Sequence, residues 1–76
     1  MDAEGKRELR LLGDAIRAKR TALKVSQEDF AELANVHRTY IGQVERGEKN
    51  VSAVNIFRLS KALKIKPSAL FKDAGL

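Results

Sequence analysis

The sequence predicts an all-α domain of five short helices, and three observations carry this prediction. Apolar residues recur at spacings of three and four along most of the chain, which is the period of a helix with one buried face. Residues that cap helix starts, Ser26 and Ser52, stand just before two of these stretches. The chain has 76 residues, enough for one modest core. We therefore expect a single compact domain over residues 1–76.

The composition is that of a folded, basic chain. Hydrophobic residues make up 43% of the sequence and charged residues 33%, which favours a packed domain over a disordered one. The net charge of +5 favours a polyanionic partner. Because there is no cysteine and one histidine, we expect no disulfide, metal or cofactor. The start of the chain is charged, and no stretch approaches the roughly 20 apolar residues of a membrane helix, so we expect a cytoplasmic protein.

The first helix is expected over residues 6–23, after a start (1–5) that lacks an apolar anchor and should fray. Its apolar stripe comprises Leu9, Leu12, Ile16 and Leu23. Gly13 lies on the same face, where another helix could approach closely. Arg20 falls on that stripe too, and a cation on a buried face needs a partner.

Two short helices joined by a tight turn should follow, over residues 27–34 and 38–46. Ser26 is a good N-cap for the first, with the acidic residue of a capping box three positions later. Its apolar face comprises Phe30, Ala31, Leu33 and Ala34. Asn35 tolerates the left-handed conformation that the turn needs, and Gly47 is suited to end the second helix.

The second helix of this pair has two faces of different character. One face carries the apolar Ile41 and Val44 together with Glu45. The opposite face carries Thr39, Gln43 and Arg46. Because Glu45 takes an inward position that matches that of Arg20, we predict an Arg20–Glu45 ion pair. In the alternative, Arg20 reaches solvent and Glu45 merely lies near a helix end.

Two more helices complete the expected fold, over residues 53–63 and 67–72. On the first of them, Val54 and Phe57 lie nearly opposite the residues that should enter the core. One core cannot easily cover both faces, so we expect a subunit contact there, although isolated exposed apolar residues are common. The candidate dimer-interface residues are Val54, Phe57, Leu70 and Phe71.

The stretch from Ser26 to Gly47, with its Ser-Gln-Glu start and Glu-Arg-Gly end, resembles the helix-turn-helix of the phage-repressor, or Xre-like, family. The run His-Arg-Thr-Tyr-Ile and the loop with Asn50 and Ser52 are most similar to the controller proteins of restriction–modification systems. The resemblance covers nearly the whole chain and implies a compact five-helix, repressor-like DNA-binding domain. Many family members have glycine where this chain has Lys24, so the left-handed turn expected there either carries a strain of about 1 kcal/mol or takes another shape.

By the same resemblance, the second helix of the motif enters the major groove of DNA, and its outward residues become candidates for base reading. Arg38 is the first choice, because a guanidinium can donate two hydrogen bonds to guanine. Thr39 offers a hydroxyl and a methyl group, and Gln43 offers an amide that can pair with adenine. Tyr40 lies to one side, where it could stack on a sugar, bond a phosphate or pack against its own protein.

Other polar residues are candidates for contacts with the DNA backbone, at helix N-termini or next to the reading helix. They are Gln27, His37, Arg46, Lys49, Asn50, Ser52 and Asn55. For each of them, a helix cap or a solvated surface group is an equally good interpretation. His37 has no serine, cysteine or paired carboxylate at a spacing that forms a catalytic group, so we expect no enzyme.

Together these observations predict a homodimeric, sequence-specific regulator of transcription that binds a pseudo-palindromic operator in double-stranded DNA. Like a controller that both activates and represses, it would act by occupancy, blocking RNA polymerase at one site or contacting it at another. The rival interpretation is an antitoxin or adaptor that holds an unlike protein with the candidate interface residues. DNA binding would then be secondary.

Overall fold

The computed structural model describes residues 5–76, so the fraying expected of residues 1–5 falls almost entirely outside the described residues. The described chain forms five α-helices: α1 (Lys6–Ala22), α2 (Gln27–Ala34), α3 (Arg38–Glu45), α4 (Ala53–Ala62) and α5 (Pro67–Asp73). The predicted all-α fold is confirmed, and every helix end lies within one residue of its expected position. No helix among residues 5–76 combines the length and apolar character required to cross a membrane.

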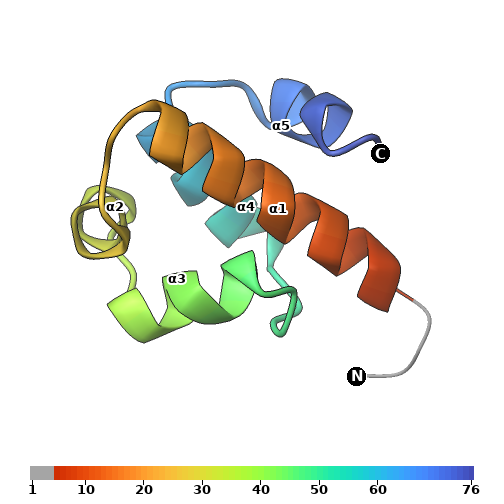
Figure 1. Cartoon of the computed structure of the whole chain (residues 1–76), viewed down its shortest axis with the longest axis horizontal. Coiled ribbons are helices and arrows are strands. Elements are labelled where there is room, and N and C mark those ends of the chain that lie inside the picture. Colours follow the sequence, from red (N-terminus) through yellow and green to blue (C-terminus); the bar gives the residue numbers. More distant parts are fainter. Residues whose placement is uncertain (1–4) are drawn as a thin grey trace.

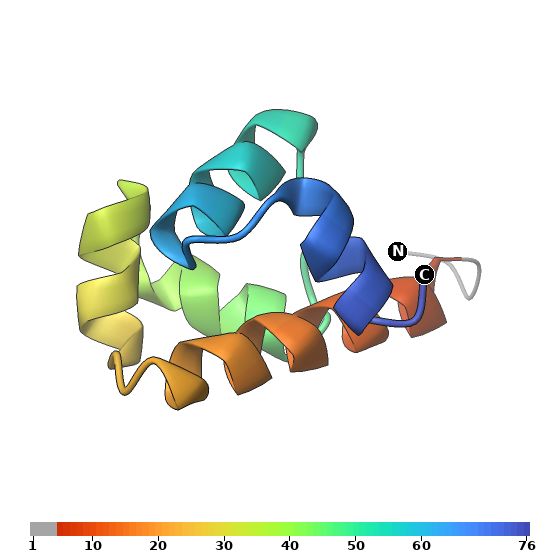
Figure 2. The same ribbon diagram turned by 90° about the horizontal axis from the view of Figure 1, so that it is seen from above.

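The long helix α1 lies between α3 and α5. Figure 1 shows α3 on one side of α1 and α5 on the other, and α1 contacts both. Helix α2 packs against α3 and α4, and α4 packs against α5. Seen from above in Figure 2, α2 closes one end of the bundle. This arrangement places the α2–turn–α3 unit at one edge of the domain, with one side of α3 turned outward.

The core draws on all five helices, and its members correct one prediction. The residues that are less than 2% exposed are Phe30, Ile16, Ile41, Leu59, Leu63, Leu70, Val44 and Ser60. Leu70 was expected at a subunit contact, and this is wrong: it is 0% exposed, because α5 turns it towards α1 and α4. Val54 and Phe57 are 56% and 59% exposed, as their position opposite the core of α4 predicts.

Two leucines that the sequence assigned to buried faces lie at the surface. Leu33 is 63% exposed and Leu23 is 37% exposed. Helix α2 spans eight residues and packs on its neighbours through Phe30, Ala31 and Ala34, and Leu33 falls outside this narrow contact. Leu23 lies just beyond the last turn of α1. Helical periodicity assigned Leu33 and Leu23 to apolar faces, but no neighbouring helix in residues 5–76 buries these two side chains.

Each helix in residues 5–76 is followed, within two positions, by a residue in the left-handed conformation. These residues are Lys24, Asn35, Gly47, Lys64 and Gly75, with φ of 59°, 58°, 74°, 61° and 79°. In each turn the next N–H donates to the carbonyl five positions earlier, as from Val25 to Arg20 over 3.2 Å, which is the Schellman pattern. Lys24 therefore takes the strained turn that the family resemblance suggested. Lys64 takes the same turn, which the sequence analysis did not predict.

Close backbone approaches at two glycines fix α3 against α1. A Cβ on Gly13 would lie 2.4 Å from the carbonyl oxygen of Val44, so the close helix approach expected there is present. At the end of α3, Gly47 combines a positive φ with a similar approach, because a Cβ would lie 2.9 Å from Cα of Arg10. Since neither site has room for a side chain, the position of α3 on α1 is tightly set.

Candidate nucleic-acid interface

The α2–turn–α3 unit is built from local signals in the sequence. The Ser26 hydroxyl accepts a hydrogen bond from the amide of Asp29 over 3.0 Å and caps α2. Asn35 turns the chain, and His37 is the N-cap residue of α3 without a side-chain hydrogen bond of its own. The inner face of α3 places Ile41 in the core. The helix is thus anchored on one side and free on the other.

The ion pair predicted between Arg20 and Glu45 is present and buried. Nε of Arg20 donates to Oε2 of Glu45 over 2.6 Å, and Nη2 donates to Oε1 over 3.0 Å. The two side chains are 11% and 3% exposed. Nη1 of Arg20 donates to the carbonyl oxygen of Val25 over 2.9 Å. One guanidinium therefore joins α1, α3 and the turn before α2.

Gln27, at the N-terminus of α2, completes this network. Its Nε2 donates to Oε1 of Glu45 over 3.0 Å, so one amide hydrogen is used inside the protein. The sequence placed Gln27 among the contacts with the DNA backbone without anticipating this bond. Residues 18 positions apart on different helices share no period, so no sequence signal pointed to it. The second amide hydrogen of Gln27 has no partner in residues 5–76.

The outward side of α3 carries the residues expected to read bases. Arg38 and Thr39 are exposed, and Gln43 is half-buried. Within residues 5–76, no hydrogen bond or ion pair holds the side chains of these three residues. A guanidinium, a hydroxyl and an amide are thus available to an external partner along one helix face. In Figure 1 this helix forms the lower edge of the domain.

Beyond α3, Arg46 is held by its neighbour Glu48. Nε of Arg46 donates to Oε2 of Glu48 over 3.0 Å, and Nη2 donates to Oε1 over 3.1 Å, both at the surface. The hydrogen bonds from Arg46 lower the pKa of the Glu48 carboxyl, and the same contact raises the pKa of Arg46. To grip a phosphate, Arg46 must leave or share this carboxylate. Lys49 and Asn50 lie in the exposed loop that follows, and no ion pair or side-chain hydrogen bond within residues 5–76 holds either of them.

The first turn of α4 carries the last two backbone candidates, Ser52 and Asn55. The Ser52 hydroxyl accepts from the amide of Asn55 over 3.1 Å and caps the helix. The side chain of Asn55 donates from Nδ2 to the hydroxyl oxygen of Tyr40 over 3.0 Å. The half-buried ring of Tyr40 also lies against the core. Of the three alternatives for Tyr40, the structure therefore shows packing against its own protein.

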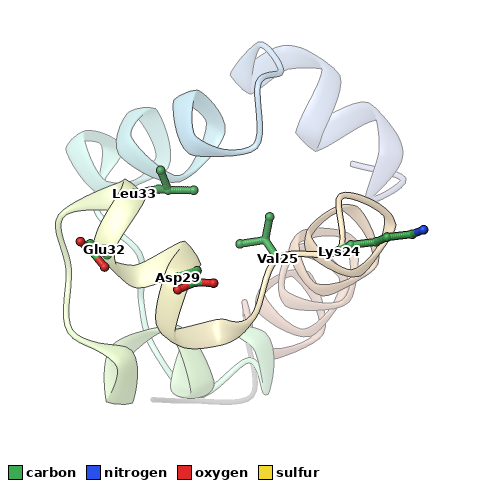
Figure 3. A pocket seen from close by; sticks show the side chains of 5 residues that line it. All are labelled: Lys24, Val25, Asp29, Glu32 and Leu33. Atoms are coloured by element: carbon green, nitrogen blue, oxygen red, sulfur yellow. The ribbon is translucent and has the colours of Figure 1, made fainter.

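A hollow beside α2 is unsuited to DNA. It has a volume of about 670 Å³ and is lined by Lys24, Val25, Asp29, Glu32 and Leu33. Figure 3 shows the side chains of Val25 and Leu33 projecting into it, with the amine of Lys24 directed away. Two carboxylates on its wall, those of Asp29 and Glu32, repel phosphate, so this hollow is a poor site for a nucleic acid. No cluster of three or more His, Cys, Asp or Glu side chains in residues 5–76 could hold a metal ion.

Comparison with known proteins places this geometry among helix-turn-helix proteins. A helix-turn-helix family model matches residues 16–70. The control protein C.SmaI of Serratia marcescens is 41% identical over 66 residues, which are 87% of this chain and 79% of that protein.

Two solved structures share the fold. The restriction–modification controller protein C.AhdI of Aeromonas hydrophila superposes with a TM-score of 0.81 and 48% identity, covering 83% of this chain and 96% of that one. The DNA-binding domain of the P22 C2 repressor superposes with a TM-score of 0.77 and 38% identity, covering 80% of each chain.

Proposed function

Because this chain belongs to the helix-turn-helix family, whose members are DNA-binding regulators of transcription, we propose that it reads a specific operator with the outward side of α3. The observation that carries this proposal is the contrast between the two sides of that helix. The inner side is fixed by the close approach at Gly13 and by the buried Glu45. The outer side leaves Arg38 and Thr39 exposed, and no side chain within residues 5–76 holds either of them by a hydrogen bond or an ion pair. A helix presented in this way fits the major groove.

The side chains divide into two roles. Arg38, Thr39 and Gln43 read base edges, with Arg38 donating both hydrogen bonds to one guanine. The residues around them grip phosphates and set the register without reading sequence. These are Gln27, His37, Arg46, Lys49, Asn50 and Ser52, with Tyr40 and Asn55 beside them. The net charge of +5 adds a sequence-independent attraction that weakens as salt is raised.

The protein acts as a homodimer. Val54 and Phe57 form an exposed apolar pair on α4. We assign the half-buried Phe71 to the same interface, because it belongs to α5, which contacts α4. Covering this surface with a second copy removes apolar area from water. A two-fold dimer places two α3 helices on half-sites about 34 Å apart, one turn of DNA.

Sedimentation of two matched variants tests the dimer. Phe57→Glu should sediment as a monomer, because a carboxylate at the contact must be desolvated. Leu33→Glu alters an equally exposed leucine, at 63%, on α2, and should remain dimeric. Dimers in both variants would place the contact elsewhere. If the protein purified from its native cells carries a second, unlike polypeptide in stoichiometric amount, that result would instead favour the antitoxin or adaptor interpretation.

The regulatory role follows from occupancy. We propose that the chain is a restriction–modification controller, as C.AhdI is. In this proposal it represses when it covers the binding site of RNA polymerase and activates when it contacts polymerase from an adjacent site. We propose that it acts in the cytoplasm, together with the DNA that it regulates. Because base reading and backbone grip need no chemical step, this role requires no catalytic activity.

Two substitutions separate base reading from backbone grip. Arg38→Ala should abolish preference at one base pair of each half-site, a loss of about 1–3 kcal/mol of discrimination, with non-specific binding nearly intact. Lys49→Ala should weaken binding to all duplexes alike and reduce the slope of log affinity against log salt. Equal weakening on every sequence by Arg38→Ala would show that Arg38 only contacts phosphate.

A further inference from the structure

One hydrogen bond joins the reading helix to the helix that follows it. Asn55, in the first turn of α4, donates from Nδ2 to the hydroxyl oxygen of Tyr40, in the first turn of α3, over 3.0 Å. Both residues are half-buried. The place of Asn55 is itself set by its backbone amide, which donates to the capping hydroxyl of Ser52 over 3.1 Å. The phenol is therefore held at a defined point between α3 and α4.

The direction of this bond decides what the phenol can do next. A tyrosine hydroxyl has one hydrogen to donate, and toward Asn55 it acts as the acceptor. Its own hydrogen is consequently left over, and no hydrogen bond within residues 5–76 uses it. The ring packs against the core, so the hydroxyl is the polar tip of an anchored side chain. An anionic acceptor gains most from a donor held in this way.

The position of Tyr40 on α3 indicates which part of DNA the hydroxyl meets. At about 100° per residue, Tyr40 lies about 200° from Arg38 and about 60° beyond Gln43, at the edge of the outward face of α3. The bond from Asn55 holds the phenol towards α4. A side chain displaced from the base-reading edge in this way lies beside the groove, where the phosphates run.

We propose that Asn55 is a positioning residue for DNA binding, holding the Tyr40 hydroxyl so that its hydrogen is donated to a backbone phosphate of the operator. This proposal rests on the proposed function above. It replaces the direct phosphate contact expected of Asn55 with an indirect one through Tyr40. The contribution of Asn55 to affinity therefore exists only while Tyr40 carries its hydroxyl.

A double-mutant cycle tests this dependence with fluorescence anisotropy on a labelled duplex selected by the wild-type protein. Tyr40→Phe should weaken binding roughly tenfold, the loss of one hydrogen bond to a charged group. Asn55→Ala should weaken binding roughly three- to fivefold in the wild-type background. In the Tyr40→Phe background the same substitution should change nothing further. Equal losses from Asn55→Ala in both backgrounds would overturn the proposal and assign Asn55 a direct contact.

A second variant keeps the shape of the side chain and reverses the hydrogen bond. Asn55→Asp presents a carboxylate that can only accept, so it should capture the hydrogen of Tyr40 and remove it from the DNA. The added negative charge lowers the affinity for DNA whether or not the Tyr40 hydroxyl is present. The effect of Tyr40→Phe is therefore measured by comparing Asn55→Asp alone with the double variant Asn55→Asp, Tyr40→Phe. That effect should fall from tenfold to nearly none. A retained tenfold effect would contradict the proposal.

Measurements on the free protein distinguish positioning from a merely structural role. Tyr40 is the one tyrosine and the chain has no tryptophan, so near-ultraviolet absorption reports directly on its phenol. Asn55→Ala should shift this absorption while the melting temperature changes little. The proposal is overturned if the tyrosine absorption band of Asn55→Ala is unshifted. It is also overturned if the loss of DNA affinity in Asn55→Ala is explained by a smaller fraction of folded protein. If the wild-type protein selects no duplex, the proposed function fails together with this inference; if it selects one and the cycle is additive, the inference alone fails.

Discussion

Glu45→Gln should destabilise the domain strongly, although it changes a single atom. The carboxylate is 3% exposed and accepts three hydrogen bonds, two from Arg20 and one from Gln27. An amide can keep its oxygen at the position shared by Nη2 of Arg20 and Gln27. Its nitrogen then faces Nε of Arg20, where a contact of 2.6 Å joins donor and acceptor in the native protein. Two donors would meet there, and the guanidinium would lose its counter-charge.

Removing one partner of a buried ion pair costs about 3–5 kcal/mol, and we expect the lower end because the amide retains part of the network. Domains have about 0.05–0.15 kcal/mol of stability per residue, so a loss of about 3 kcal/mol is a large share of the total here. For a domain of this size it corresponds to a fall in melting temperature of roughly 12–24 °C.

The chain supplies a matched control for this measurement. Arg46 and Glu48 form a bidentate pair through the same atoms, but their side chains are 60% and 54% exposed. Glu48→Gln should therefore leave the melting temperature unchanged. Both variants are followed by circular dichroism during thermal and urea unfolding, at one protein concentration because a dimer links stability to concentration. A negligible loss in Glu45→Gln, equal to that in Glu48→Gln, would refute the reasoning.

Four further predictions concern single sites. Gly13→Ala should cost several kcal/mol in urea unfolding, since its Cβ would lie 2.4 Å from a backbone carbonyl oxygen of α3; a change below about 1 kcal/mol would contradict the tight approach. Ser60→Ala should stabilise by about 1 kcal/mol, because the buried hydroxyl has no partner in the described chain; destabilisation would reveal one. Lys24→Gly should raise stability by about 0.5 kcal/mol by relieving a φ of 59°, and a loss would show that the turn is unstrained. In an NMR titration the pKa of Glu48 should lie below its ordinary value and rise in Arg46→Ala, where an unchanged pKa would deny the contact.

Features that depend on neighbouring residues in the chain were predictable. Helix boundaries follow from caps and left-handed turn residues, and Ser26, Ser52 and Asn35 act as local physics requires. The Arg20–Glu45 pair was also predictable, because a cation and an anion each fell on a face that had to be buried. Because burying an unpaired charge costs much free energy, the sequence predicts that these two residues pair, although they lie far apart in the chain.

Features that depend on which helix covers a given face were not predictable. Leu70 was taken for a surface contact, yet the short helix α5 turns it into the core. Leu33 was taken for a core residue, yet the contacts of α2 end before it. The bond from Asn55 to Tyr40 and the contact of Gln27 with Glu45 join helices whose packing is set by the whole fold. No pattern within one helix carries that information.

The central claim, that α3 reads a specific operator as part of a two-fold dimer, is tested most directly by selection from a random DNA library. The purified full chain is incubated with random duplexes, and the bound fraction is recovered and sequenced. We predict a pseudo-palindromic motif with half-sites about 34 Å apart, one helical turn. Recovery of no motif by the folded protein would contradict the account, because its charge of +5 would then provide only non-specific attraction.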